Sequence, residues 1–191
     1  MIVENVIRHI KNLSRSEDYS AVVAALSKYA DYPAQEFKSA LETLQHHRED
    51  LLAAAKGELG RMTRSQDPLE IDAALSRYAG HGSDVATETQ NLHAARRQLI
   101  AGARREMSRL AASKQSTTTQ IEAALERYTN FPVELNDVRR VLIDRLESTR
   151  TVKQQLLSSQ SAVDPAFILR ELQRHESFGP AVDEERAALT K

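Results

Sequence analysis

Asp72-Ala-Ala-Leu-Ser-Arg-Tyr78 is one of three copies of a heptapeptide that decides the fold predicted for this chain. The other copies are Val23-Ala-Ala-Leu-Ser-Lys-Tyr29 and Glu122-Ala-Ala-Leu-Glu-Arg-Tyr128. Their leucines, Leu26, Leu75 and Leu125, stand 49 and 50 residues apart, and a weaker copy at 168–175 places Leu172 another 47 residues on. A repeat of this length indicates one supersecondary unit stacked on copies of itself.

Each repeat begins with a short segment whose apolar residues recur at i, i+4 and i+7, which places them on one face of a helix. The triplets are Val22/Leu26/Tyr29, Ile71/Leu75/Tyr78, Ile121/Leu125/Tyr128 and Ile168/Leu172/His175. Capping signals precede them at Asp18, Asp67-Pro68, Thr117 and Asp164-Pro165. Glycine or proline follows each triplet, at Pro33, Gly80, Pro132 and Gly179. We therefore expect four short helices whose triplets are core, so that Leu75→Ala or Leu125→Ala costs about 2–5 kcal/mol.

Long segments with heptad-like apolar stripes follow the short ones, and they predict long helices over 34–63, 84–113 and 133–160. The connections are short, so consecutive helices should pack antiparallel. The predicted fold is all-α, a tandem array of unequal helical hairpins with a period of about 49 residues, forming an elongated bundle or α-solenoid. We expect a single domain over 1–191. Its parts are a partial repeat at 1–15, full repeats at 16–64, 65–114 and 115–161, and a second partial repeat at 162–191.

Composition narrows the class of protein further. The 26 basic and 27 acidic residues nearly cancel, so no net charge draws the chain of 191 residues to nucleic acid or membrane. Because there is no cysteine, disulfides and thiolate metal sites are excluded, which fits the cytoplasm or another intracellular reducing compartment. No secretory signal and no apolar run of about 18 residues is found, so no membrane span is expected.

The sequence offers no pattern that carries catalysis. It has no nucleophile elbow, no phosphate-binding loop and no Gly-x-Gly-x-x-Gly. The six histidines are scattered or directly adjacent, so they form no metal-ligand spacing. We predict a protein that is not an enzyme, with no catalytic residue, cofactor or metal.

Two kinds of conspicuous side chain recur in register. Arg48, Arg96 and Arg145 lie on or beside the apolar stripes, at intervals of 48 and 49 residues. They could line a groove for an acidic ligand, or their stems could pack while the guanidinium groups bond acids or carbonyls at a turn. The structural interpretation is favoured, because a residue repeated in every unit usually maintains the unit. For the same reason the tyrosines of the triplets are expected to fill the core rather than stack on a ligand.

One cluster of charge stands apart. Arg97, Arg104, Arg105 and Arg109 accompany a single acid, Glu106, between Asn91 and Lys114. This basic strip could contact phosphates or an acidic partner, whereas the alternative is a solvated face paired with neighbouring carboxylates.

The expected function is a non-catalytic structural scaffold or protein–protein interaction module that forms part of a larger assembly, because long helices offer large side surfaces for docking. Partners are expected to be other proteins, or a second copy, at unfinished repeat ends that expose Ile2, Val6, Ile10, Val182 and Leu189. Binding of phosphate, nucleic acid or an acidic partner through the basic strip is the less favoured alternative.

Overall fold

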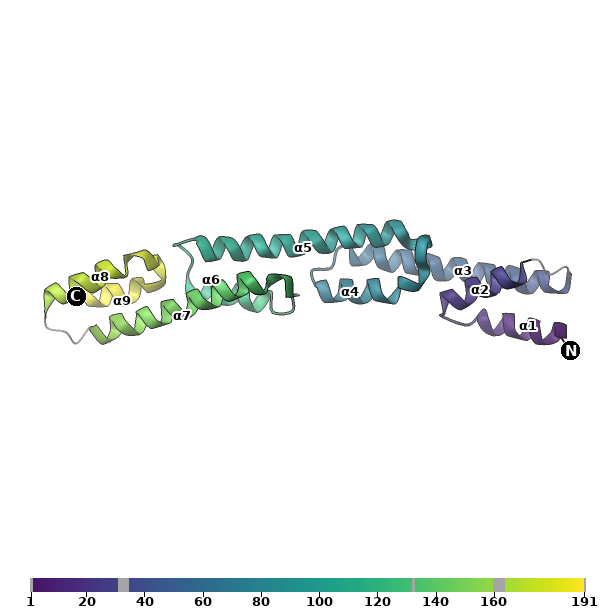
Figure 1. Cartoon of the computed structure of the whole chain (residues 1–191), viewed down its shortest axis with the longest axis horizontal. Coiled ribbons are helices and arrows are strands. Elements are labelled where there is room, and N and C mark those ends of the chain that lie inside the picture. The colour runs from purple at the N-terminus through teal and green to yellow at the C-terminus, as the bar shows by residue number, and fades with distance from the viewer. Residues whose placement is uncertain (1, 31–34, 132, 160–163, 191) are drawn as a thin grey trace. The chain divides into compact units, whose positions relative to one another are not determined.

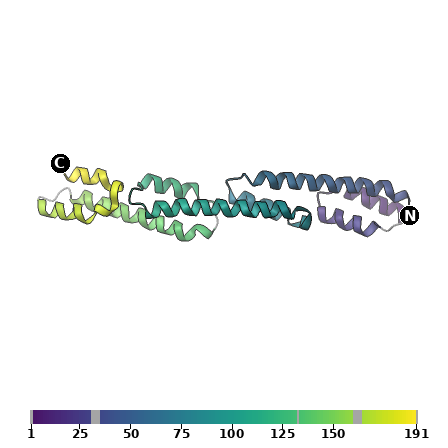
Figure 2. The ribbon, with the colours of Figure 1, turned by 90° about the horizontal axis from the view of Figure 1, so that it is seen from above.

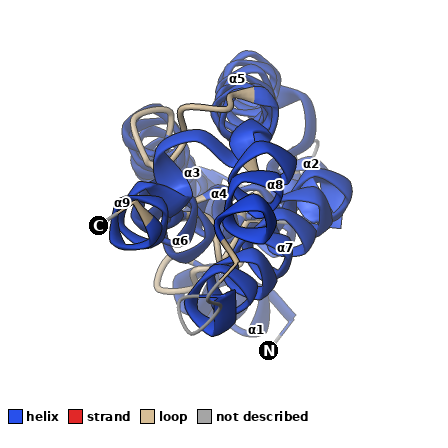
Figure 3. Cartoon of the chain, turned by 90° about the vertical axis from the view of Figure 1, so that its left-hand side faces the viewer, coloured by secondary structure: helices blue, strands red, loops and turns tan. Residues whose placement is uncertain are grey.

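The computed structural model describes residues 2–30, 35–131, 133–159 and 164–190. Within this part of the chain every regular element is a helix (Figure 3). In chain order the elements are α1 (Ile2–Leu13), α2 (Tyr19–Tyr29), α3 (Gln35–Met62), α4 (Pro68–Arg77), η1 (Ala79–Val85), α5 (Ala86–Ala112), α6 (Thr118–Arg127), η2 (Val133–Leu135), α7 (Asn136–Ser159), α8 (Pro165–Arg174), η3 (Glu176–Val182) and α9 (Asp183–Leu189). The all-α prediction is confirmed. None of the described helices is long and apolar enough to cross a membrane.

The short helices begin where the capping signals predict. Asp18, Asp67 and Asp164 each accept a hydrogen bond from a backbone N–H of the first turn. Thr117 and Gln120 form a reciprocal capping box at the start of α6. The expected breakers Pro33 and Pro132 lie outside the described residues.

The chain divides into two compact units, residues 1–97 and 98–191, with the division inside α5. In the first unit, α1 and α2 pack on α3, and α4 and η1 also contact α3 (Figures 1 and 2). Its main core joins α1, α2 and the first half of α3, and the buried members of that core are Ile10, Val22, Ala25, Tyr29, Phe37 and Leu44.

In the second unit, α7 is the common partner of α6, α8, η2, η3 and α9. Its larger core combines the second half of α5, α6 and the first half of α7, with Met107, Ile121, Leu135 and Leu142 almost fully buried. A smaller core of Val152, Leu156 and Val182 joins the second half of α7 to η3.

The buried face of the short helices differs from the predicted triplets. Alanines at i+3, namely Ala25, Ala74 and Ala124, are buried together with Val22, Ile71 and Ile121. The leucines at i+4, Leu26, Leu75 and Leu125, are only half-buried. Positions i+3 and i+4 flank the same helical face. A small side chain at i+3 lets the backbone approach the long helix, and the leucine is left at the edge of the contact.

The prediction that the fourth short helix, α8, buries its apolar triplet in the core is wrong. No residue of α8 is buried, Ile168 and Leu172 are half-buried, and only the residue after the helix, His175, is covered. The ends also differ from expectation, because Ile10 and Val182 are fully buried within their own units. Val6 and Leu189 are half-buried, and the side chain of Ile2 lies outside the described part.

Glycine is required at two corners. Gly82 in η1 has φ 55° and Gly179 in η3 has φ 56°, a left-handed conformation that other residues seldom adopt. A Cβ on Gly179 would also lie 2.5 Å from the Lys114 carbonyl oxygen. The corner of η3 therefore rests directly on the turn between α5 and α6.

Candidate functional site

Two of the repeated tyrosines fasten their short helix to the preceding long helix. In the first unit the Tyr78 hydroxyl donates to Glu58, and Arg77 reaches the other oxygen of the same carboxylate at 2.5 Å. In the second unit Tyr128 donates to Glu106 at 2.5 Å, and Arg127 bonds the other oxygen at 3.1 Å. We call these Arg-Tyr-Glu arrangements the clamps.

The clamps change the acid–base behaviour of their tyrosines. Burial raises the pKa of Tyr78, and the hydrogen bond to Glu58 raises it further. Burial and the bond to Glu106 raise the pKa of Tyr128 in the same way. Each phenol is thus held protonated and serves as a donor to a carboxylate. In the first copy Tyr29 meets the His9 ring edge-on, with centroids 6.3 Å apart.

A second aromatic contact recurs at the corners, and the sequence analysis missed it. The ring three residues after the tyrosine or histidine packs edge-to-face on it in three places: Tyr78–His81 at 5.2 Å, Tyr128–Phe131 at 4.9 Å and His175–Phe178 at 6.1 Å between centroids. The signal was present as an aromatic residue or histidine at a fixed spacing of three. These pairs stabilise the corner that reverses the chain.

The three repeated arginines all bond within the protein, but to different partners. Arg48 on α3 bonds Asp84 of η1 at 2.8 Å, and Arg96 on α5 bonds Asp72 of α4 through both carboxylate oxygens, at 2.6 and 3.0 Å. Arg145 on α7 donates to the backbone carbonyls of Leu110, Ala111 and Ser113, at 2.9, 2.6 and 2.5 Å. A cation at this place satisfies the last carbonyls of α5 and complements its dipole.

A cluster of polar side chains surrounds Arg48. The Tyr19 hydroxyl donates to Asp84, Arg48 donates to Tyr19 at 3.2 Å, and the His81 ring stacks on Tyr19 with centroids 4.1 Å apart. Hydrogen bonds from Tyr19 and then Arg48 hold the pKa of Asp84 below its ordinary value. Burial raises the pKa of Tyr19, and the bond to Asp84 adds to this rise.

His81 is the titratable group of that cluster that has a ring nitrogen without a hydrogen bond. Its Nδ1 is buried without a hydrogen-bond partner, and burial lowers the pKa of the imidazole although Asp84 opposes the change. The carboxylate, phenol and guanidinium beside it already bond one another. The arrangement fixes η1 against α2 and α3, and it leaves no nucleophile paired with a base.

The predicted basic strip is brought together only in part. Arg104 forms a double hydrogen bond with Asp137, at 2.9 and 3.0 Å, and also bonds the Glu134 carbonyl. Arg97, Arg105 and Arg109 are exposed, and Arg105 donates to the Ala101 carbonyl of its own helix at 3.3 Å. One of the four cations is therefore already paired with a neighbouring carboxylate.

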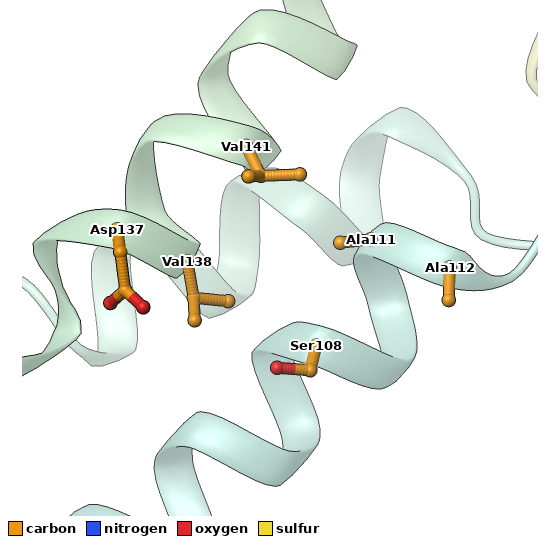
Figure 4. A pocket seen from close by; sticks show the side chains of 6 residues that line it. All are labelled: Ser108, Ala111, Ala112, Asp137, Val138 and Val141. Carbon is orange, nitrogen blue, oxygen red and sulfur yellow. The ribbon is translucent and has the colours of Figure 1, made fainter.

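Each unit has a groove between the end of one helix and the start of the next helix but one along the chain. In the second unit it measures about 360 Å³ and is lined by α5 and α7 (Figure 4); the lining residues are Ser108, Ala111, Ala112, Asp137, Val138 and Val141. In the first unit it measures about 500 Å³ and lies between α1 and α3; the lining residues are Ile7, Lys11, Ser14, Arg15, Ser39, Ala40 and Thr43.

The described residues contain no group of three or more histidines and carboxylates placed to hold a metal ion. Comparisons with protein families, with characterised proteins and with solved structures find no match to this chain. The functional argument therefore depends on the contacts of its own residues.

Proposed function

We propose that this protein is a non-catalytic scaffold or protein–protein interaction module, built as a tandem array of unequal helical hairpins. The observation that carries the proposal is the use made of the repeated polar side chains. Arg48, Arg96 and Arg145 and the two clamps all join one helix to another. Side chains that occupy the same position in successive repeats and join helices in this way stabilise the fold. The outer faces of the helices then remain available for partners.

The grooves support the interaction role. They recur at matching positions in the two units, with some exposed apolar surface, as at Val141, which is 53% exposed. A helical framework with recurring grooves suits docking of a partner segment. We assign partner contact to these grooves rather than to the chain ends, because Ile10 and Val182 are covered. The lack of cysteine further favours an intracellular reducing compartment.

The test is affinity capture from the source cell with the tagged full chain, followed by mass spectrometry and reconstitution with each purified candidate. The proposal expects a defined protein that binds stoichiometrically and survives nuclease treatment. Light scattering on the purified chain examines self-association at the same time. A chain that remains monomeric and reconstitutes with no protein would refute it.

The competing hypothesis is binding of phosphate or nucleic acid through the basic strip. Recovery that is lost with nuclease, falls steeply with salt and is weakened by Arg104→Gln/Arg105→Gln would instead establish phosphate or nucleic-acid binding. The pairing of Arg104 with Asp137 favours the scaffold, because that guanidinium is occupied.

A further inference from the structure

The grooves of the two units occupy corresponding places in the sequence. Lys11, Ser14 and Arg15 of the first groove stand 97 residues before Ser108, Ala111 and Ala112 of the second. On the opposite wall, Ser39, Ala40 and Thr43 stand 98 residues before Asp137, Val138 and Val141. The two grooves therefore lie at corresponding positions in the sequence but have different lining side chains.

The difference lies in charge. The first groove has two exposed cations, Lys11 and Arg15, and neither forms an ion pair with a described residue. The corresponding positions of the second groove, Ser108 and Ala112, are small and uncharged. The second groove has one charged lining residue, Asp137, and Arg104 already pairs with it.

Two hydroxyl groups of the first groove already donate their protons to the backbone. Ser14 donates its hydroxyl proton to the Ile10 carbonyl at 3.1 Å, and Thr43 donates to the Ser39 carbonyl at 2.8 Å. The free donors among the charged lining residues are thus the ammonium of Lys11 and the guanidinium of Arg15. Half-buried Ile7 and Ala40 supply an apolar patch beside them.

We propose that the groove between α1 and α3 binds an acidic amphipathic helix of a partner protein; this inference rests on the proposed scaffold function. Lys11 lies in the last turn of α1 and Arg15 in the turn that follows Leu13, and both line the same groove. Two carboxylates on one face of a ligand helix supply an acceptor for each cation. A small apolar residue between those carboxylates faces Ile7 and Ala40, as in other helix-in-groove contacts.

The experiment uses the full chain and a fluorescein-labelled peptide of about 18 residues, long enough to form a helix once bound. The peptide carries glutamate pairs at i and i+4 beside an alanine-leucine stripe, and its glutamine counterpart is the second probe. Fluorescence anisotropy should show binding of the glutamate peptide that weakens as salt is added. Lys11→Gln/Arg15→Gln should lower the affinity by roughly fivefold or more, since each exposed ion pair contributes up to about a fivefold factor.

The matched control is Arg61→Gln/Arg64→Gln, which removes the same charge from two other exposed residues of the first unit. It should leave the affinity within about twofold, because distant exposed charges are screened. Circular dichroism melts of both variants verify the fold, and Ala40→Leu, which fills the groove without changing charge, should also weaken binding.

Three results would overturn the proposal: equal affinity for the glutamine peptide, an unchanged affinity in Lys11→Gln/Arg15→Gln, or an equal loss in the control. Either of the last two, obtained alongside a reconstituted protein partner, would defeat the groove assignment and leave the scaffold standing. Failure to reconstitute any partner would instead defeat the scaffold.

Discussion

At the scale of single residues, the tyrosine that follows α4 and the one that follows α6 each combine two roles. Its ring fills the contact between helices, while its hydroxyl reaches a carboxylate on the preceding long helix, Glu58 or Glu106. A buried hydroxyl must find an acceptor, and a carboxylate is the stronger choice. The arginine before the tyrosine bonds the second oxygen of the same carboxylate.

Replacing Glu106 by Gln tests this clamp. The amide still accepts from Tyr128, but the ion pair with Arg127 is lost and the bond becomes a neutral one. We expect the free energy of unfolding to fall by about 1 kcal/mol, measured by urea denaturation. Glu126→Gln, an exposed change on α6, is the control and should alter it by less than about 0.5 kcal/mol. Equal effects would show that the clamp contributes nothing.

The buried imidazole of His81 predicts a pH dependence of stability. Its pKa is lowered in the folded state, so the unfolded chain binds the proton more readily. The stability contribution is therefore present above the ordinary histidine pKa of about 6.5, and it is lost as pH falls toward the folded-state value. His81→Phe keeps an aromatic ring, as at Phe131 and Phe178, and should remove this part of the acid-induced fall in Tm.

The control for His81 is His93→Gln, since His93 is exposed on α5. That variant should retain the pH profile of the parent protein between about pH 7 and 5. An unchanged slope in His81→Phe would mean that other groups account for the acid sensitivity.

At the scale of elements, the amino-acid pattern predicted the helices well but not which residues they bury. Capping residues and breakers act locally, so Asp67, Thr117 and Asp164 mark helix starts from sequence alone. Burial depends on how closely two helices approach, which the sequence does not show. In the structure the alanines at i+3 are buried, whereas the leucines that we expected to be buried are not. The arginines illustrate the same limit: their spacing showed a repeated role, whereas the partner, acid or carbonyl, depends on tertiary contacts.

This correction changes the expected effect of core substitutions. Leu125→Ala should cost only about 1 kcal/mol, because Leu125 is half-buried, whereas Ile121→Ala should cost about 2–4 kcal/mol. Ala124→Leu should also destabilise, by about 1–3 kcal/mol, since the added methyl groups separate α6 from α7. Urea denaturation of the three variants ranks them, and a leucine effect as large as that of Ile121 would contradict the burial pattern.

Arg145 on α7 tests whether a side chain from one helix stabilises the C-terminal end of another helix, α5. Arg145→Met keeps the packed stem but removes the donors to three carbonyls at the end of α5, so stability should fall by about 1.5–3 kcal/mol. Arg150→Met on the same helix breaks only an exposed pair with Glu122 and should cost less than about 1 kcal/mol. If the two variants unfold alike, the carbonyl contacts have no stabilising role.

At the scale of the whole molecule, the two units have several features in common. Each has a short helix clamped to a long one, a glycine corner and a groove at a corresponding position. What the sequence could not provide was the groove itself, because its walls come from segments about 30 residues apart whose residues are individually ordinary. Only their juxtaposition shows that Lys11 and Arg15 face Ser39 and Thr43 across one hollow.

A tandem array predicts that damage remains local, because each unit is stabilised by itself and its neighbours. Ile121→Ala removes a buried side chain from the core of the second unit. Amide hydrogen exchange should show lost protection in α6 and the first half of α7, while α2 and the first half of α3 retain theirs. Ile71→Ala, the corresponding change in the first unit, should produce its largest loss in α4. Equal loss of protection across all described helices in both variants would identify one fully cooperative domain and exclude the array.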